Sequence, residues 1–401
     1  MRTNLPVTQN EVQLTDQHLI VSKTDLKGSI TYANKDFLDI SGFSEAELIG
    51  QPHNIVRHPD MPAEAFEPVP WRGVVALMLV PVYVALMALI AAGVMPWWGD
   101  VLVGLVIGQI VTSVGLTAHE VMHRSSFRSN FMQRLTGWIG FCWYGISAGT
   151  WHAWHVLAHH GNTQDGDADP DRLMTLERYR SGGLARAIHA VTPGSGTLIS
   201  RVSLCFLFTM QAQLFLWYYC DQPEYSKIRI NRWRERAFTL IEVAAWVALA
   251  AAMGPWAALC AILIPMLVSN ATLMMYISTN HWLRPITPDH NNPFTNTTSV
   301  IVHPFVDWVH VAFSYHQEHH IFPQMSPKYA PLLRQKLLEL EPAAVTAYPL
   351  GAVMREIFRT PSIYLDDHTL VREDGSGAVT VEEIDARLRA EAGALRVAPA
   401  S

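Results

Sequence analysis

Histidines are gathered into short clusters rather than spread along the sequence. Six of the 18 histidines lie between residues 119 and 160, and four lie between residues 310 and 320. The imidazole nitrogen is a ligand for iron, zinc, copper and nickel, so clustered histidines indicate metal chemistry. A single isolated histidine is more often a structural residue, but clustering of this density is difficult to explain in that way.

The first and third clusters have spacings that place two imidazoles on one side of a helix. His119 and His123 are four residues apart and therefore share a helical face. The third cluster reads H-Q-E-H-H, in which His316 pairs with His319 or His320 in the same way. Each cluster can thus offer at least two ligands to metal ions.

The second cluster contains the pattern H-x-x-x-H-H and is the richest of the three. In a regular α-helix His155 and His159 share a face, whereas the adjacent His160 points about 100° away. One short helix can therefore serve two metal ions. His152, three residues before this pattern, is a further candidate ligand that could equally be a supporting or packing residue, and the same alternatives apply to His310.

His281 stands alone in the sequence but follows the last long apolar run, at the membrane level where the clusters gather. It is the ninth candidate. Nine imidazoles are too many for one tetrahedral zinc and suit two ions with four or five nitrogen ligands each. The predicted metal ligands are His119, His123, His155, His159, His160, His281, His316, His319 and His320.

Acidic residues near the clusters are candidates to support the ligands. A metal-binding imidazole usually donates its other N–H to a carboxylate or a carbonyl group. Glu120 and Glu318, inside the first and third clusters, could accept such a bond or could face water. Four aspartates after the second cluster could have the same supporting role or could simply form an acidic loop. They are Asp165, Asp167, Asp169 and Asp171.

Long apolar runs must position these clusters. Half of the 401 residues are hydrophobic and 16% are charged. The runs at residues 73–95 and 255–278 are each long enough to cross roughly 30 Å of hydrocarbon as a helix. Together with residues 101–118 and 238–254, they form two helical hairpins. This organisation predicts an integral membrane protein.

Positive charges predict the orientation of the hairpins. The connection at residues 96–100 contains no Lys or Arg, whereas Arg124, Arg128 and Arg134 follow the second span. By the positive-inside rule, the histidine clusters and both termini are expected on the cytoplasmic side, which for a bacterial protein means the cytoplasmic side of the inner membrane.

Two shorter apolar stretches leave the number of spans open between four and six. Residues 135–150 and 202–220 are interpreted as interfacial or re-entrant helices, because one crossing each would break the topology; the alternative is a six-span bundle. The predicted fold class is therefore mainly α. A membrane helical bundle with a cytoplasmic histidine-lined cap (71–365) follows a small α/β segment (1–70) and precedes a cytoplasmic tail (366–401).

These motifs resemble the membrane fatty-acid desaturase superfamily, which includes acyl-lipid desaturases and alkane hydroxylases. The resemblance covers residues 75–360 and rests on H-E-V-M-H at 119–123, H-V-L-A-H-H at 155–160 and H-Q-E-H-H-I-F-P at 316–323. It implies a non-haem di-iron centre, dioxygen as co-substrate, a lipid acyl chain as substrate, and an external ferredoxin, rubredoxin or cytochrome b5-type electron donor. The third motif is most similar to desaturases and the first equally to hydroxylases, so both reactions stay open.

Residues 20–66 resemble the N-terminal half of a PAS domain of the aerotaxis-receptor kind. Such receptors bind FAD, and the resemblance points to Asn34, Arg57, His58 and Asp60 as candidate flavin-binding positions. A membrane span begins where the later strands of a PAS sheet should follow, so half of a sheet would have to bury its own core. The alternatives are an oxygen or redox sensor completed by a partner, a dimerisation element, a donor-docking element or a remnant of gene fusion.

Other classes of protein explain less of the sequence. A net charge of -6 with few charged residues does not favour nucleic-acid binding, and four isolated cysteines exclude iron-sulfur and cysteine-type zinc sites. The pattern H-E-x-x-H at residues 119–123 also occurs in zinc metalloproteases. A protease would leave seven clustered histidines unexplained, and a PAS-based redox sensor with a membrane anchor would leave all nine unexplained.

Overall fold

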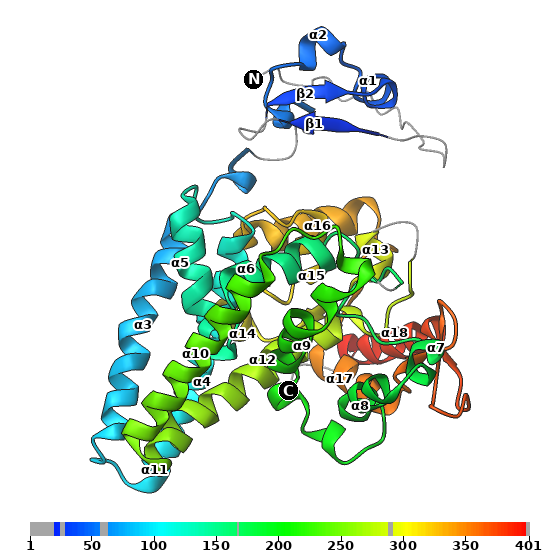
Figure 1. Cartoon of the computed structure of the whole chain (residues 1–401). Helices are drawn as coiled ribbons and strands as arrows, with labels where there is room; N and C mark the ends of the chain where they lie inside the picture. Colours follow the sequence, from blue (N-terminus) through cyan, green and yellow to red (C-terminus); the bar gives the residue numbers. More distant parts are fainter. Residues whose placement is uncertain (1–19, 25–28, 57–62, 167, 288–291, 398–401) are drawn as a thin grey trace. The chain divides into compact units, whose positions relative to one another are not determined.

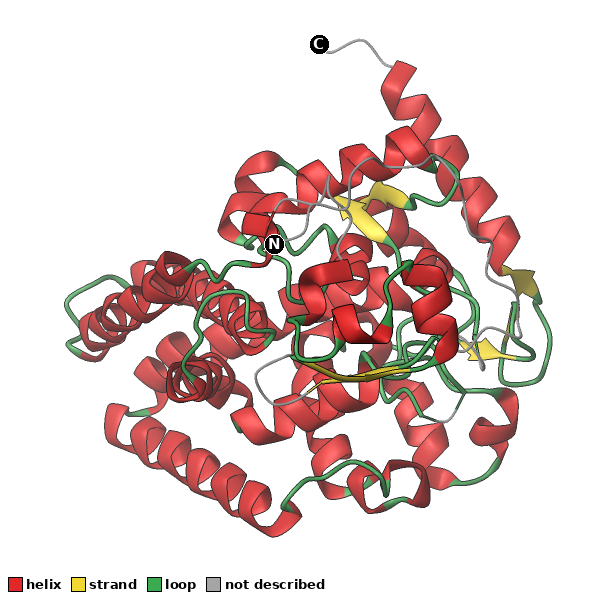
Figure 2. Cartoon of the chain, turned by 90° about the horizontal axis from the view of Figure 1, so that it is seen from above, coloured by secondary structure: helices red, strands yellow, loops and turns green. Residues whose placement is uncertain are grey.

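The protein is mainly helical, as predicted, with a few short strands (Figures 1 and 2). A computed structural model describes residues 20–24, 29–56, 63–166, 168–287 and 292–397. The chain divides into two compact units, residues 1–65 and residues 66–401.

The N-terminal unit is a small α/β element. β1 (Ser22–Thr24) pairs antiparallel with β2 (Ile30–Ala33), and α1 (Lys35–Ser41) and α2 (Glu45–Leu48) follow. α1 ends at Gly42, whose φ of 68° is the left-handed conformation that glycine adopts at low cost. The unit has its own small core: Ile30, Ala33, Phe37, Phe43 and Leu48.

Four long apolar helices form the membrane part of the second unit. α3 (Pro70–Ala91), α4 (Trp97–Met122), α10 (Arg232–Met253) and the continuous helix Pro255–His281 are long and apolar enough to cross a membrane. The continuous helix comprises α11 (Pro255–Ala258), the π-helical segment η8 (Leu259–Leu263) and α12 (Ile264–His281). α4 packs against both α3 and α12 (Figure 1).

The spans extend beyond the apolar runs. α4 begins at Trp97, inside the connection expected at residues 96–100, where Asp100 contributes a carboxylate to the first, electropositive helical turn. Asp100 also accepts a hydrogen bond of 2.8 Å from Trp256 Nε1, which joins the tips of the two hairpins. α12 continues to His281, so this histidine belongs to the helix and does not follow it.

The two shorter apolar stretches are helices too short to cross a bilayer. α5 (Asn130–Phe141) has 12 residues and α9 (Leu204–Trp217) has 14. At 1.5 Å per residue they are about 18 and 21 Å long, against roughly 30 Å of hydrocarbon. α5 packs against α4, and α9 packs against α12. Within the described residues, the structure therefore favours four spans over six.

The polar end of the unit carries short helices and strands around the ends of α4 and α12. β3 (Ser299–Ile301) pairs parallel with β4 (Ala347–Pro349), while β5 (Ile363–Tyr364), β6 (Thr369–Val371) and β7 (Val379–Thr380) form an antiparallel sheet. α17 (Leu350–Arg359) packs against α12 and α18 (Val381–Val397). The other helices there are α7 (Leu176–Arg180), α8 (Gly183–Val191), α13 (Pro293–Asn296), α14 (Pro304–Val309) and α16 (Ala330–Leu340).

Gly104 permits the close approach of the two hairpins. A Cβ atom at Gly104 would lie 2.3 Å from the backbone oxygen of Cys260, which cannot move independently of its helix. We expect Gly104→Ala to lower the thermal unfolding midpoint in detergent. Gly351→Ala is the matched control, because a Cβ there meets only the flexible end of Arg355 at 3.6 Å. Removing this helical glycine should stabilise by up to about 1 kcal/mol. Equal shifts for both variants would contradict the close helix contact.

Candidate metal centre

The first histidine cluster lies at the end of α4. His119 and His123 face the same side of the helix, with ring centroids 4.8 Å apart. Both side chains are buried. Arg124, directly after the cluster, has a left-handed backbone with φ 67°, which turns the chain away from the helix axis.

The second cluster lies on a π-helix, which changes the predicted pairing of its histidines. After α6 (Ala148–Trp151), η4 (His152–His159) has π-helical geometry, and the N–H of His160 donates to the carbonyl of His155 at 2.9 Å. Residues five apart are therefore neighbours, and the Nε2 atoms of His155 and His160 lie 3.1 Å apart. The α-helical spacing assumed from the sequence did not predict this approach of His160 to His155. The predicted pairing of His155 with His159 is also present, since both lie within ligand distance of one another and of Asp171.

The third cluster and His281 complete the arrangement. α15 (His316–Ile321) presents His316 and His320 together, with Nε2 atoms 3.1 Å apart. The Nε2 atom of His281, at the end of α12, lies 2.7 Å from that of His316. His319 points to the other side, where its Nε2 atom lies 3.3 Å from that of His160.

The nine predicted ligands thus converge in two neighbouring groups. The ligand atoms of the five-histidine group, which is His119, His123, His155, His160 and His319, lie within 4.8 Å of one another. The same holds for His159, His281 and His320, and His316 joins these three through the contacts above to make the four-histidine group. The stacked rings of His160 and His320, with centroids 4.2 Å apart, connect the groups.

The spacing of the imidazoles fits metal ligation. Two nitrogens bound to one ion at about 2.1 Å lie roughly 3 to 3.5 Å apart, close to the Nε2–Nε2 distances here. Nε2 of His123 is buried without a hydrogen-bond partner, as are Nδ1 of His281 and Nδ1 of His316. Unpaired buried imidazole nitrogens are costly unless they meet another partner, and in the five-histidine group a metal ion would be that partner.

Carboxylates orient two of the ligands. Nδ1 of His159 donates to Asp169 at 2.9 Å, which directs Nε2 toward the four-histidine group. Nδ1 of His119 donates to Glu120 at 3.2 Å. Burial opposes ionisation of Asp169, but the charge of His159 and several hydrogen bonds hold the pKa of Asp169 below its usual range. Burial raises the pKa of the neighbouring Asp171 to about 6.

Gln164 is a supporting residue that the sequence did not reveal. Its Nε2 donates to the carbonyls of His281 and Arg284, at 2.9 Å each, and its backbone N–H donates to Asp169 at 2.8 Å. Its φ of 58° is unusual for a residue other than glycine. Gln164 therefore joins the end of α12 to the second cluster, and nothing in the residue type or spacing could have indicated this.

Other candidates do not reach the two groups. His152 is exposed, and His310 bonds to Tyr276 and Gln109 instead. Glu318 is buried, but it pairs with Arg334 at 2.6 Å and with Ser299 at 2.7 Å, so it fixes α15 rather than an imidazole.

The remaining candidate residues from the sequence are Asp165, Asp167 and the four suggested flavin positions. Asp165 makes a backbone bond to Asn162 and belongs to neither metal group. Asn34 begins α1, and its side-chain oxygen accepts from the backbone N–H groups of Phe37 and Val21. Outside the described residues lie Asp167, Arg57, His58 and Asp60.

Burial keeps most of the clustered imidazoles neutral; at His159 it is outweighed by the carboxylate of Asp169, which raises the pKa of that imidazole. Desolvation lowers the pKa of His319 to about 3 and holds the pKa of the neighbouring ligands below the usual value of 6.5. A neutral imidazole has the free lone pair that a metal requires. Outside the spans, the ligands with lowered pKa are His123, His155, His160, His316, His319 and His320.

These pKa shifts predict acid sensitivity of the metal-free protein. Below pH 6.5 the unfolded chain binds protons at these histidines and the folded chain does not, so stability is present above pH 6.5 and is lost as the pH falls. The slope is up to about 1.4 kcal/mol for each histidine and pH unit. Thermal unfolding midpoints measured with a chelator should fall steeply as the pH is lowered from about 7 to about 5. A flat profile would contradict burial of these imidazoles.

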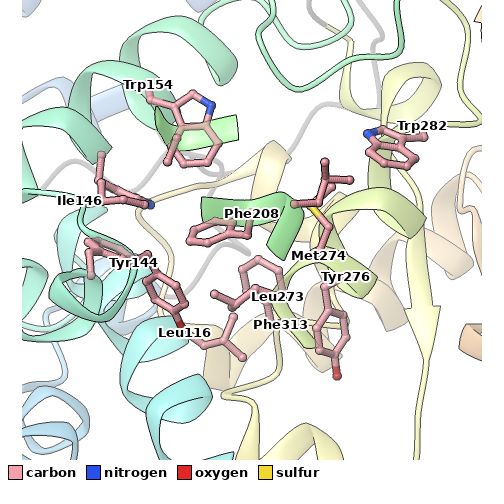
Figure 3. Close-up of a cluster of buried hydrophobic side chains, with 14 of the residues drawn as sticks. Leu116, Tyr144, Ile146, Trp154, Phe208, Leu273, Met274, Tyr276, Trp282 and Phe313 are labelled. Carbon is pink, nitrogen blue, oxygen red and sulfur yellow. The ribbon is translucent and has the colours of Figure 1, made fainter. Parts of the chain in front are cut away.

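A small, mainly apolar cavity lies against both groups. Its apolar wall includes Leu116, Phe208, Leu273 and Phe313, which converge in Figure 3. Histidines of both groups line the same space: His119, His155, His159, His281 and His316. Apart from these histidines and Asp171, the lining is apolar, which suits an alkyl chain.

Comparison with known proteins gives two matches in different parts of the chain. The family model described as fatty acid desaturase matches residues 95–351, which contain all nine clustered histidines. The aerotaxis receptor of Escherichia coli (strain K12) is 47% identical over 77 residues, which is 17% of this chain and 15% of the receptor. The chain therefore spans only a small part of that relative's length.

Proposed function

Because the chain belongs to the fatty acid desaturase family of di-iron oxidoreductases, we propose that it introduces a double bond into an acyl chain of a membrane lipid. The observation that carries this proposal is the apolar cavity whose wall contains imidazoles of both histidine groups. Such a cavity can hold unactivated methylene groups beside two metal ions.

The proposed metal is iron. Imidazole also binds zinc, copper and nickel, but zinc has no redox chemistry, and the family to which the chain belongs is one of di-iron oxidoreductases. When bound, two iron ions would supply the activation of dioxygen. The five-histidine group and the four-histidine group would each hold one ion, and Asp169 and Glu120 would keep His159 and His119 in the orientation that ligation needs.

The cavity residues determine where the chain lies. Leu116, Phe208 and Leu273 supply apolar contacts, and the side chains of Phe141 and Trp151 stack with centroids 5.0 Å apart beside His119 and His155. These side chains exclude water from the reacting segment. Because they offer no hydrogen bond to the substrate, position along the chain depends on shape and on where the polar end of the lipid is held.

The overall reaction needs an external donor. Loss of two hydrogens from adjacent methylenes, with reduction of dioxygen to two waters, consumes two electrons and two protons. We propose a ferredoxin, a rubredoxin or a cytochrome b5-type protein as the donor, acting from the cytoplasmic side, where the histidine clusters and both termini are placed by the positive-inside rule. The same centre could instead hydroxylate the chain, with one oxygen atom retained in the product.

Expression with a ferredoxin system, followed by mass spectrometry of membrane fatty acids, tests the reaction. The expected result is new unsaturation at a defined carbon, absent from a His155→Ala control. A hydroxylated fatty acid without new unsaturation would contradict desaturation and support the alternative reaction. The H-E-x-x-H protease interpretation is disfavoured by the family and by the burial of Glu120 against His119.

A further inference from the structure

The segment between β3 and the third histidine cluster has the surface of a membrane-inserted element. α14 (Pro304–Val309) contains no buried residue, and its two aromatic side chains are largely exposed: Phe305 is 64% exposed and Trp308 is 77% exposed. The helix is short, lies after the last span, and carries no long apolar run. Hydropathy of the sequence therefore gives no sign of it.

His310 places this segment beside the middle of α4. Its Nε2 donates to the side-chain oxygen of Gln109 at 3.3 Å, and its Nδ1 accepts from the hydroxyl of Tyr276 at 3.0 Å. One tautomer of His310 satisfies both bonds. Gln109 is ten residues, or about 15 Å, from His119 and about 18 Å from Trp97 along the helix. His310 therefore lies near the centre of a span, within the depth of the hydrocarbon.

The neighbouring surface of α4 is one that lipid must cover. Leu102, Leu105 and Val106 are exposed on α4, three to seven residues before Gln109 and on the same side of the helix. In a membrane-spanning helix, exposed leucine and valine face acyl chains. The exposed aromatics of α14 continue this lipid-facing surface, because His310 fixes the end of α14 against Gln109.

A strained turn connects this surface to the cavity. Val311 and Ala312 follow with φ of 59° and 58°, and a β-branched residue in this conformation is a marked outlier. Strain of about 1 to 3 kcal/mol per residue persists only where surrounding contacts hold it, and such positions cluster at binding and switch regions. The next residue is Phe313, whose ring lies 4.9 Å from His119 and 5.5 Å from Tyr276 and lines the cavity.

We propose that residues 304–313 form a membrane-embedded portal, through which an acyl chain passes from the bilayer into the cavity between the histidine groups. α14 contacts the hydrocarbon, the bonds of His310 anchor it to α4 and α12, and Phe313 with Tyr276 closes the passage. Figure 3 shows these two aromatic side chains near Leu273 and Leu116. The occupant is the acyl chain of a membrane lipid. The portal role rests on the proposed function, whereas the insertion of α14 does not.

Spin-label depth measurements test the insertion. Single cysteines at 305 and 308, in a background without the four native cysteines and reconstituted in phosphatidylcholine vesicles, would be compared with Leu105→Cys on α4 and Leu340→Cys on α16. Labels on α14 should be relaxed by oxygen and protected from a water-soluble nickel complex, as at residue 105. Accessibility to nickel equal to that at residue 340, whose side chain is 75% exposed, would overturn the proposal.

Substrate kinetics in proteoliposomes test the portal. Phe305→Ser combined with Trp308→Ser should raise the apparent KM for the lipid substrate by about fivefold or more, with kcat changed less than about twofold and iron content unchanged. The matched control is Leu338→Ser with Leu340→Ser, which removes two exposed apolar side chains from α16. An unchanged KM in the α14 variant would overturn the portal. If the wild-type protein altered no acyl lipid, the proposed function would fail while the depth measurement still decided the insertion.

Discussion

His155→Ala is expected to reduce activity to background and to remove the metal ion of the five-histidine group. The Nε2 atom of His155 lies 2.9 Å from that of His119 and 3.1 Å from that of His160, so His155 is central to that group. Iron analysis of the purified variant should therefore show about one iron ion per chain instead of about two.

The matched control for this prediction is His152→Ala. His152 lies on the same π-helix, three residues earlier, but it is exposed and belongs to neither histidine group. We expect this variant to keep its iron and its activity. Loss of iron in His152→Ala, or full activity in His155→Ala, would show that the ligands have been assigned wrongly.

Asp169→Asn is expected to weaken the metal site of the four-histidine group selectively. Asp169 accepts three bonds, from Nδ1 of His159 and from the backbone N–H groups of Asp171 and Gln164, and an amide has only one oxygen for these three donors. Loss of such a supporting carboxylate typically costs 10–100-fold in metal affinity. Titration with a chelator should therefore remove one iron ion at a lower chelator concentration than in the wild-type protein, while the other is retained.

Asp171→Asn provides the comparison for this second prediction. Asp171 is also buried, but its nearer oxygen is 3.6 Å from Nδ1 of His159, beyond hydrogen-bond distance. Its other oxygen accepts from Trp154 at 2.8 Å, which an asparagine can still do. The loss of metal affinity should be smaller than for Asp169→Asn. Equal losses would mean that negative charge near His159 matters more than the direct hydrogen bond.

The gathering of these nine histidines could be predicted from the sequence because metal ligation requires local clustering. His119 and His123 are one helical turn apart, and the apolar runs locate the helices that carry them. His281 could be predicted for a different reason, since the end of an apolar run shows the depth of the residue. All nine predicted ligands lie in the two groups.

The division of these ligands between two ions could not be predicted. It depends on the π-helical geometry that brings His155 to His160, and backbone geometry of this kind leaves no periodic signature in eight residues. The bonds of Gln164 and the position of α14 were also hidden. Both depend on contacts between residues more than one hundred positions apart in the chain.

In the N-terminal unit, the sequence resemblance is confirmed but the function that it suggests is untested. Its resemblance to the aerotaxis receptor is confirmed by 47% identity over 77 residues. Of the four candidate flavin positions, only Asn34 lies within the described residues, and its side-chain oxygen accepts two backbone hydrogen bonds at the start of α1. Asn34 therefore caps the start of α1. Flavin binding stays a prediction, which the visible absorbance of the purified protein would test.

The two histidine groups are the central claim, and metal analysis with Mössbauer spectroscopy of the purified, unmodified protein tests it most directly. Five and four imidazoles predict about two iron ions per chain in two distinguishable nitrogen-rich environments. One zinc ion per chain with no iron would contradict the account, because a single tetrahedral ion would leave at least five of the buried imidazoles without a role.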